Sequence, residues 1–194
     1  MTALPIHRDH LPYASALASR SLDQIDLAVI HCTELPDLAM SRAFGERIQY
    51  AESGTGNSGH YYVEQSGRVE EWVPPDRVAH HVRGYNERSV GIELVNRGRF
   101  PDWFDSRRQT MSEPYPGEQI ASLIALLALL QLRLPALRWI AGHEALDVSR
   151  VESSDQPTLS VYRKRDPGIM FPWSKVLAAV ALEWLPDAPA HGLS

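Results

Sequence analysis

Two histidines and one aspartate have the residue types of a hydrolytic metal site. His31 ends the apolar run LAVIH, His143 ends the run RWIAGH, and Asp166 stands directly before Pro167. Two neutral imidazoles and one carboxylate would leave the fourth position of a tetrahedral zinc ion open for water. Pro167 disfavours helical backbone at Asp166 and so favours an extended carboxylate. The residues predict a three-ligand zinc site, against the alternative that each histidine is a hydrogen-bonded core residue.

Glu93 is the candidate for proton transfer. It lies in the run VGIELV, where strand alternation places it on the face opposite Ile92 and Leu94. If that face lines a cavity, a partly dehydrated carboxylate has a raised pKa and can act as a general base. If it faces solvent, Glu93 is an ordinary surface residue.

The single cysteine, Cys32, could be a thiol nucleophile. It follows His31 in an extended segment, however, and so points the other way, which favours a small buried side chain.

Strand and helix patterns supply the elements that would position these residues. Apolar and β-branched runs predict strands at 27–30, 60–64, 69–73, 90–95 and 137–141, and helical spacing predicts helices at 37–50, 118–132 and 174–184. Gly67, between the runs 60–64 and 69–73, is expected to supply the positive φ of a hairpin turn. Strands mixed with crossover helices predict a mixed α/β fold, with a central mixed β-sheet flanked by helices in one domain.

The remaining segments set the expected domain limits. Residues 1–24 show no periodicity and are expected to form an N-terminal arm, followed by the domain at 25–186 and a C-terminal tail at 187–194. The segments 99–117 and 147–163 are too polar for a core, and the sequence indicates that both are loops. Loops of this length in a small domain are usually functional or disordered, so we expect them to wall a groove.

Composition excludes several classes of protein. With 44% hydrophobic and 22% charged residues the chain is neither collagen-like nor disordered, and its one cysteine excludes a disulfide-stapled scaffold. The net charge of −5 leaves no excess positive charge for a phosphate backbone, so no nucleic acid partner is expected. The apolar stretch 120–134 is too short for a membrane span, and no secretory signal is visible. We therefore expect a cytoplasmic protein, with a periplasmic or exported one as the alternative.

Six motifs occur along the chain in a characteristic order. They are His31-Cys32-Thr33, His60-Tyr61-Tyr62-Val63 with Gly67, His81, Gly91-Ile92-Glu93-Leu94, Gly142-His143-Glu144, and Arg163-Lys164-Arg165-Asp166-Pro167-Gly168 with Phe171 and Trp173. With this set the chain resembles the zinc-dependent N-acetylmuramoyl-L-alanine amidases. That family includes the cytosolic muropeptide-recycling amidase and shares its fold with phage lysozyme-like amidases and peptidoglycan recognition proteins. The resemblance covers about residues 25–173, most of the chain.

The resemblance implies an activity and a role for each matching residue. The expected substrate is a muropeptide or peptidoglycan, cleaved at the amide between the lactyl group of N-acetylmuramic acid, or its anhydro form, and L-alanine. Zinc would be held by His31, His143 and Asp166, with Glu93 as the general base and Lys164 stabilising the oxyanion. The candidate substrate-binding residues are His81, His60 and Asn96.

Three departures from the family pattern leave alternatives open. A long insertion separates His143 from Asp166, and it offers other carboxylates as the third ligand: Asp147, Glu152 and Asp155. Gly59 stands where the phage branch has a tyrosine, and His80 replaces the tryptophan that usually precedes the loop histidine. Two other functions also stay open, a non-catalytic muropeptide-binding protein on the same fold and a lytic or effector amidase that acts on intact cell wall.

Overall fold

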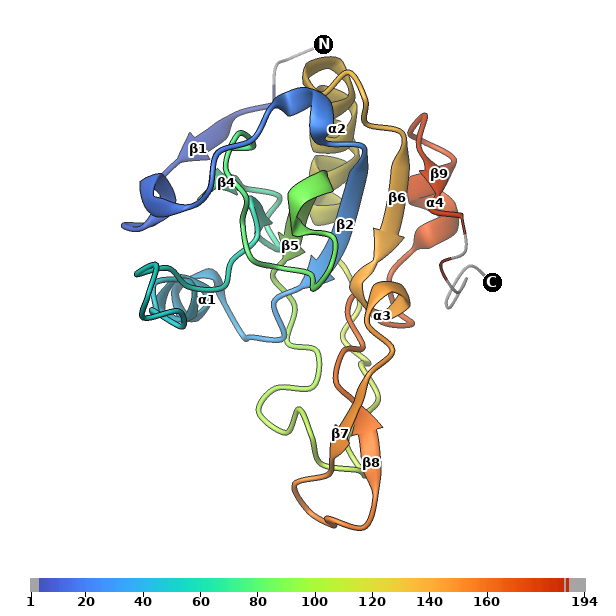
Figure 1. The fold of residues 1–194 in the computed structure, drawn as a ribbon. Coiled ribbons are helices and arrows are strands. Elements are labelled where there is room, and N and C mark those ends of the chain that lie inside the picture. Colours follow the sequence, from blue (N-terminus) through green and yellow to red (C-terminus); the bar gives the residue numbers. More distant parts are fainter. Residues whose placement is uncertain (1–3, 187, 189–194) are drawn as a thin grey trace.

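The computed structural model describes residues 4–186 and residue 188. Within these residues, seven strands form one sheet in the order β1-β4-β3-β5-β2-β6-β9 (Figure 1). They are β1 (Ile6–Arg8), β2 (Leu27–Cys32), β3 (Tyr61–Val63), β4 (Val69–Glu71), β5 (Ser89–Leu94), β6 (Trp139–Gly142) and β9 (Glu183–Trp184). Neighbouring strands are parallel except for the antiparallel pair β3 and β4. The predicted fold class, a mixed α/β domain with a central mixed sheet, is confirmed.

The helices surround this sheet. The longest helix, α2 (Gly117–Arg133), lies behind the central strands (Figure 1). The shorter elements are α1 (Leu38–Gly45), α3 (His143–Leu146), α4 (Trp173–Leu177) and the 3-10 turns Ala14–Ala16, Leu22–Gln24 and Asn86–Arg88. A separate hairpin of β7 (Arg150–Glu152) and β8 (Ser160–Tyr162) projects away from the sheet. None of the helices in the described part of the chain is long and apolar enough to cross a membrane.

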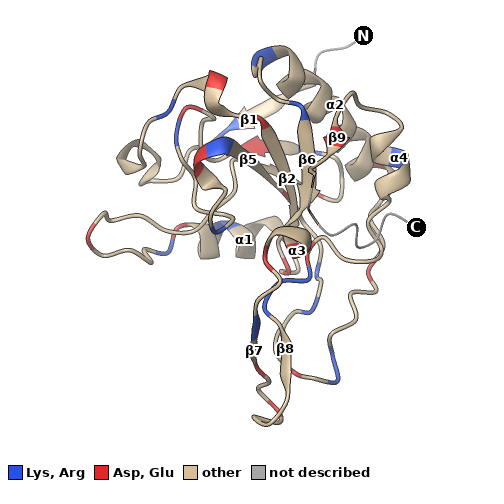
Figure 2. Cartoon of the chain, turned by 45° about the vertical axis from the view of Figure 1, so that its right-hand side comes forward, with Lys and Arg blue, Asp and Glu red and all other residues tan. Residues whose placement is uncertain are grey.

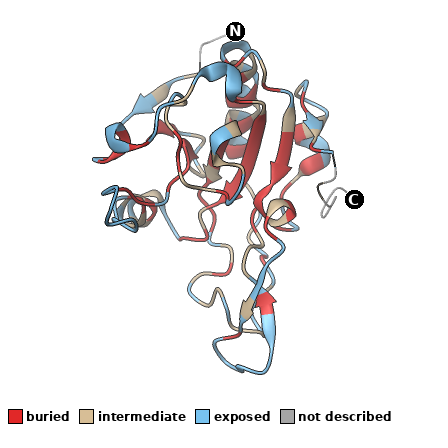
Figure 3. Cartoon of the chain, in the orientation of Figure 1, coloured by how far each residue is buried: buried red, intermediate tan, exposed pale blue. Residues whose placement is uncertain are grey.

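The central strands are covered on both faces, as their apolar composition predicts. Every residue of β2 is buried, and Figure 3 shows the buried residues gathered on the central strands while the β7–β8 hairpin is mostly exposed. On one face Ile30, Ile92 and Leu94 pack against Leu123 and Leu127 of α2. Parallel strands that are covered on both faces have a continuous apolar run in their sequence. Polar residues of β2 and β5 on the other face therefore need a structural or chemical reason.

Acidic and basic residues are interspersed over the elements rather than gathered on one of them (Figure 2). Several form local pairs, such as Arg42 with Glu46 one turn later in the chain and Arg88 with Asp26 beside the start of β2. Positive and negative side chains are thus mixed over the described part of the protein. Exposed pairs of this kind contribute little to stability.

The predicted hairpin is confirmed, with Gly67 at a φ of 85° in the turn between β3 and β4. The glycine is required by space as well as by its dihedral angle. A Cβ at Gly67 would lie 2.8 Å from Ser122 Oγ and 3.0 Å from the carbonyl oxygen of Glu118. The turn is therefore packed directly against the first half of α2.

The segment before Ile25, expected as an arm, packs against the rest of the domain. Its strand β1 pairs with β4 and forms one edge of the sheet, and Leu11, Tyr13 and Leu17 are buried beside Trp72. Periodicity did not reveal these contacts because the segment is held by single anchoring side chains between short turns. Most of the expected tail, 187–194, lies outside the described residues, which include only Ala188 there.

Three sequence predictions of local structure need correction. The helix predicted over 37–50 is capped by the side chain of Asp37 as expected but ends at Gly45, because the backbone of Gln49 and Tyr50 turns to bond the carbonyl of Thr55. The loop predicted over 147–163 contains the β7–β8 hairpin, in which Val151 and Val161 are paired.

The helix predicted over 174–184 is also wrong in its second half. Helix α4 ends at Leu177, and residues 183–184 form β9 along the open edge of β6. The rings of Trp173 and Trp184 meet edge to face at 4.9 Å, which holds β9 beside α4. The edge of a sheet offers unpaired backbone groups, and pairing with them replaces the predicted helical turns.

We expect Gly67→Ala to lower the free energy of unfolding by about 2–4 kcal/mol. The substitution places a side chain on a residue with left-handed backbone and also overpacks the contact with α2. Gly54→Ala is the matched control, because Gly54 has a φ of 65° but open space around its Cα. Its expected loss is about 1–2 kcal/mol. Urea denaturation of both variants measures the difference, and equal losses would show that the contact with α2 contributes nothing.

Candidate metal centre

Three parallel strands end at the same edge of the sheet and bring the candidate side chains together. Strand β2 lies between β5 and β6, and all three run in the same direction. His31 is near the end of β2, Glu93 is its register partner in β5, and His143 follows β6 as the first residue of α3. The carboxyl ends of parallel strands are where side chains distant in sequence converge on a ligand.

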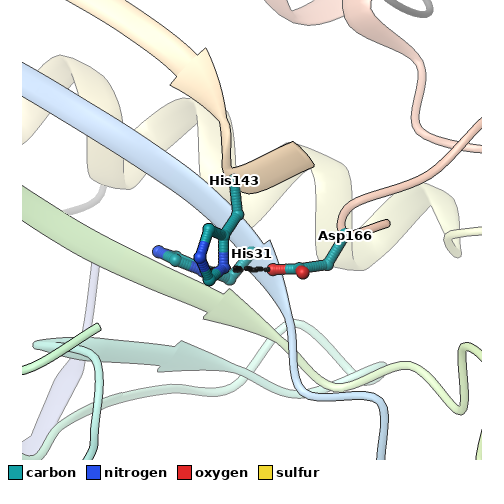
Figure 4. Close-up of side chains that lie close together, drawn as sticks. All are labelled: His31, His143 and Asp166. Carbon is teal, nitrogen blue, oxygen red and sulfur yellow. Dashed lines mark hydrogen bonds and ion pairs between the residues drawn. The ribbon is translucent and has the colours of Figure 1, made fainter. Parts of the chain in front are cut away.

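Asp166 completes a buried cluster with the two histidines (Figure 4). His31 Nδ1 lies 2.9 Å from His143 Nδ1, and Asp166 Oδ2 lies 3.1 Å from the first nitrogen and 3.0 Å from the second. Each of the three residues is 2% exposed. The structure thus brings together the three residues that the sequence singled out as ligands, and they form a group able to hold a metal ion.

The other carboxylates considered for the third ligand position lie outside this cluster. Asp147 pairs with Arg163 and accepts a hydrogen bond from Ser149. Asp155 accepts hydrogen bonds from Ser106, and Glu152 is exposed in β7. The long insertion therefore forms its own hairpin and leaves the carboxylate next to Pro167 in place.

The spacing of the three ligand atoms suits a small cation. A tetrahedral ion with bonds of about 2.0–2.1 Å separates its ligand atoms by about 3.3 Å, close to the edges of this triangle. A second oxygen of the same carboxylate, Asp166 Oδ1, and the far nitrogen His143 Nε2 are buried without a hydrogen-bond partner among the described residues. A cation would compensate the charge of this dehydrated carboxylate. The residues present therefore fit a metal ion.

The protonation states also suit a metal. Burial lowers the pKa of His31 to about 4, so its imidazole is neutral and has a lone pair to offer. Burial by itself would raise the pKa of Asp166, but the neighbouring His143 and His31 and the charge of Lys164 hold that pKa well below its usual range. The cluster consequently combines a neutral imidazole donor with an ionised carboxylate.

A chain of hydrogen bonds fixes which nitrogen of His31 carries its proton. The hydroxyl of Ser89 donates to the carbonyl of Tyr85 at 2.8 Å, so its oxygen accepts from Nε2 of His81 at 3.2 Å. Burial holds the pKa of His81 well below its usual range, which leaves Nδ1 of this neutral ring as an acceptor. His31 Nε2 lies 3.0 Å away and donates to it. The lone pair of His31 is therefore on Nδ1, facing Asp166 and His143.

Glu93 lies beside the cluster on the side opposite α2, as strand alternation predicts. Its Oε1 is 3.9 Å from His31 Nδ1, and its side chain is 16% exposed. Burial, with a smaller effect from the charge of Asp166, raises the pKa of Glu93 to about 8. Gly59 makes room for it, because a Cβ there would lie 2.8 Å from Glu93 Cγ. A residue with a side chain at position 59 would therefore displace the carboxylate of Glu93.

A cavity of about 700 Å³ opens over these residues. Lys164 and Arg163 line it from the segment before Asp166, and Trp103 and Phe104 line it from the segment 99–117. His81 lines it as well. The segment 99–117 therefore forms part of the cavity wall, as expected from the sequence, whereas the insertion 147–163 contributes only its last residue, Arg163.

Two of the candidate substrate-binding residues are not brought to the cavity. His60 is fully buried beside β5, where Nδ1 accepts from the backbone of Gly91. Asn96 is buried after β5 and connects the backbones of Glu113 and Gly98. Both side chains are occupied by the fold, because each satisfies backbone groups that the turn of the chain leaves unpaired.

Cys32 points away from the metal cluster, as alternation predicted. It is buried, and burial raises the pKa of its thiol well above the usual value. A protonated, buried thiol is a poor nucleophile. The cysteine-nucleophile alternative is therefore not supported by the environment of Cys32.

Sequence reasoning missed several residues that surround and orient the cluster. Ser89 has no local signature, since it is one serine at the start of a predicted strand, and its role depends on the approach of His81 across the sheet. Glu34 and Arg99 form a buried ion pair at the edge of the cavity, yet in the sequence each is one charged residue in a polar segment. An unusual backbone at Glu34, with a φ of 49°, is visible only in the structure.

The model of the N-acetylmuramoyl-L-alanine amidase family matches residues 21–169 of this chain. A curated relative, N-acetylmuramoyl-L-alanine amidase AmiD of Escherichia coli (strain K12), is 32% identical over 146 residues. The match covers 68% of this chain and 47% of AmiD, so the chain spans about half the length of that relative.

Solved structures share the fold at lower identity. The endolysin amidase LysCS from Clostridium intestinale URNW has a TM-score of 0.63 and 18% identity, with 94% of this chain and 99% of that chain covered. Bumblebee PGRP-SA has a TM-score of 0.59 and 18% identity, with 94% and 98% covered. The fold of this chain is thus shared with an endolysin amidase and with PGRP-SA.

We expect Ser89→Ala to weaken binding of a divalent metal by about 10-fold, the lower end of the effect of losing a direct partner of a ligand histidine, because Ser89 acts on His31 through His81. Without the hydroxyl, His81 loses the acceptor that holds its proton on Nε2. Ser41→Ala is the matched control, because Ser41 is also buried and donates to a backbone carbonyl, in α1. Competition with a chromogenic chelator measures the affinity. Equal affinity of the Ser89→Ala variant and the unmodified protein would contradict the orienting role of this chain of hydrogen bonds.

Proposed function

Because the chain belongs to the family of N-acetylmuramoyl-L-alanine amidases, we propose that it hydrolyses the amide between a muramoyl lactyl group and L-alanine in peptidoglycan fragments. The observation that carries the proposal is the complete set of His31, His143 and Asp166 at the base of the cavity, with Glu93 beside it. A protein that only binds peptidoglycan has no need of three ligand atoms spaced for a cation or of a buried carboxylate next to them.

We further propose zinc as the metal. Two imidazole nitrogens and one carboxylate oxygen are the donor set of catalytic zinc sites, which keep one position open. When bound, zinc would supply an activated water and polarise the amide carbonyl. His31, His143 and Asp166 would hold it. The tautomer imposed by His81 keeps the required lone pair of His31 available whether or not substrate is present.

Glu93 is suited to move the protons of the reaction. Its raised pKa allows the carboxylate to accept a proton from the attacking water and to retain it near neutral pH. The same proton can then pass to the nitrogen of L-alanine as the amide bond breaks, so Glu93 returns to its starting state. Its low exposure keeps bulk water from competing for this proton.

Lys164 supplies positive charge where the carbonyl oxygen becomes negative. It lines the cavity on the same segment as Asp166, and its charge lowers the pKa of both Asp166 and Glu93. A cation fixed beside a developing oxyanion in a partly dehydrated site typically contributes about 10²–10³ in rate. We assign Lys164 this role.

We propose anhydro-muramoyl peptides as the substrate class. The structure of AmiD from E. coli was determined with anhydro-N-acetylmuramic acid-L-Ala-D-gamma-Glu-L-Lys, and that of AmpDh3 from Pseudomonas aeruginosa with an anhydromuramic pentapeptide. AmiD is the curated relative that matches this chain at 32% identity. A cavity of about 700 Å³ is within the range of sites that take small ligands.

Mass spectrometry of the products tests the proposal. The zinc-loaded protein is incubated with anhydro-muropeptides, muropeptides with reducing ends, and intact sacculi. We expect a peptide with a free L-alanine amine and the intact anhydro-sugar from the first panel, at the highest rate. Cleavage of sacculi at a comparable rate would favour an amidase of intact wall, and binding of every substrate without cleavage would contradict the activity.

We expect Glu93→Gln to keep zinc and the thermal unfolding midpoint while kcat falls by about 10²–10⁴, because the amide keeps the shape and removes the base. Glu144→Gln is the matched control. Burial raises the pKa of Glu144 to about 7, but this residue does not line the cavity. Near-normal turnover by the zinc-loaded Glu93→Gln variant would show that another group accepts the proton.

A further inference from the structure

An ion pair between Arg99 and Glu34 lies buried at the edge of the cavity. Arg99 Nε is 2.6 Å from Glu34 Oε1, and Arg99 Nη2 is 2.7 Å from Glu34 Oε2. The two side chains are 1% and 9% exposed. Because removing two charges from water is costly, a buried pair is weak evidence of added stability and calls for another reason.

The guanidinium of Arg99 uses all five of its N–H groups. Besides the two bonds to Glu34, Nη1 donates to Gln109 Oε1 at 3.1 Å and to the carbonyl of Tyr162 at 3.0 Å. The fifth group, on Nη2, donates to the carbonyl of Arg163 at 3.2 Å. A planar fork with five donors fits this arrangement, whereas a lysine ammonium has three donors on one atom.

These bonds join three parts of the cavity edge. Glu34 lies in the turn after β2, three residues beyond His31, and its carbonyl accepts a hydrogen bond from Trp103 Nε1. Arg99 belongs to the segment 99–117. The two accepting carbonyls, of Tyr162 and Arg163, belong to the strap, which we define as residues 162–166. Arg99 is thus bonded to the peptide groups directly before Lys164.

Lys164 itself has little else to fix its position. Its side chain is partly exposed to the cavity. Its ammonium forms neither a hydrogen bond nor an ion pair with another side chain in the described part of the protein. Because the side chain has no partner among these described residues, the backbone that carries Lys164 determines which part of the cavity its ammonium can reach. For Lys164 that backbone is held on its N-terminal side by Arg99 and on its C-terminal side by Asp166 in the metal cluster.

We propose that Arg99 is a positioning residue for Lys164. Its guanidinium, neutralised by Glu34, clamps the carbonyls of Tyr162 and Arg163 and so aims the Lys164 ammonium at the site of the oxyanion. Glu34 is needed because an unpaired buried arginine would add a second positive charge near the cluster and destabilise the fold. The proposal rests on the proposed amidase function, since Lys164 has its role there.

A double-mutant cycle tests the coupling. Arg99→Lys, Lys164→Ala and the double variant are compared with the unmodified protein, all zinc-loaded, on an anhydro-muropeptide. We expect Lys164→Ala to lower kcat by about 10²–10³-fold, and Arg99→Lys to lower it by about 10-fold or more with KM and zinc content little changed. The double variant should be no slower than Lys164→Ala, because residues that act as a unit are not additive. Multiplied losses would overturn the proposal.

Two further variants separate positioning from stability. In the combined variant Glu34→Met and Arg99→Met, both charges are replaced by apolar side chains, a change that often leaves stability intact. We expect it to fold and to lose kcat as Arg99→Lys does; a folded variant with normal kcat would overturn the proposal. Arg88→Lys is the control, because Arg88 forms a comparable forked pair with Asp26 at the opposite end of β2. It should leave kcat unchanged.

Amide hydrogen exchange gives a readout that does not depend on activity. The backbone of the strap should exchange faster in Arg99→Lys and at the normal rate in Lys164→Ala, because the lysine side chain does not hold the strap. Unchanged exchange in Arg99→Lys would overturn the proposal even if kcat falls. If the unmodified protein cleaves none of the muropeptides, the proposed function fails, and the exchange measurement still decides whether Arg99 holds the strap.

Discussion

The organisation of this protein depends on three electron-pair donors that lie within about 3 Å of one another and are almost fully buried at the base of a cavity. His31 Nδ1, His143 Nδ1 and Asp166 Oδ2 form a triangle that a single shared proton could not satisfy, and a bound cation would satisfy all three at once. The parallel arrangement of β5, β2 and β6 places the two histidines at one edge of the sheet, and the strap brings the carboxylate. Burial makes the site effective, because it keeps the imidazole of His31 neutral and raises the pKa of Glu93.

The orienting groups form two systems next to this triangle. On the face of the sheet that carries Glu93, Ser89 and His81 determine the tautomer of His31 through a chain of hydrogen bonds that begins at the carbonyl of Tyr85. At the edge of the cavity, Arg99 and Glu34 connect the end of β2 with the strap. Two glycines leave room for polar side chains beside the cluster. A Cβ at Gly91 would lie 2.6 Å from the ring of His81, and a Cβ at Gly59 would meet Glu93. Glycines at these points are therefore part of how the fold accommodates its polar groups.

The sequence predicted the central strands, α2, the β3–β4 hairpin and the three clustered residues, because each is marked locally by apolar periodicity, turn chemistry or a residue type at a strand end. It did not predict β9 or the packing of residues before Ile25, since both depend on the open edges of a sheet that only the folded chain provides. His60 and Asn96 have residue types that suit substrate binding, but their side chains form hydrogen bonds with backbone groups instead. Arg99 shows the opposite case, an arginine in a polar segment whose partners come from positions 34, 109, 162 and 163.

X-ray absorption at the zinc edge, combined with metal analysis, tests the central claim most directly. We expect one zinc per chain in the unmodified protein, coordinated by two imidazole nitrogens and by oxygen at about 2.0–2.2 Å. Asp166→Ala should lose most of the zinc, and Asp147→Ala should retain it with the same coordination. A sulfur ligand, or full zinc with unchanged coordination in Asp166→Ala, would contradict the assignment of the triangle as the metal site.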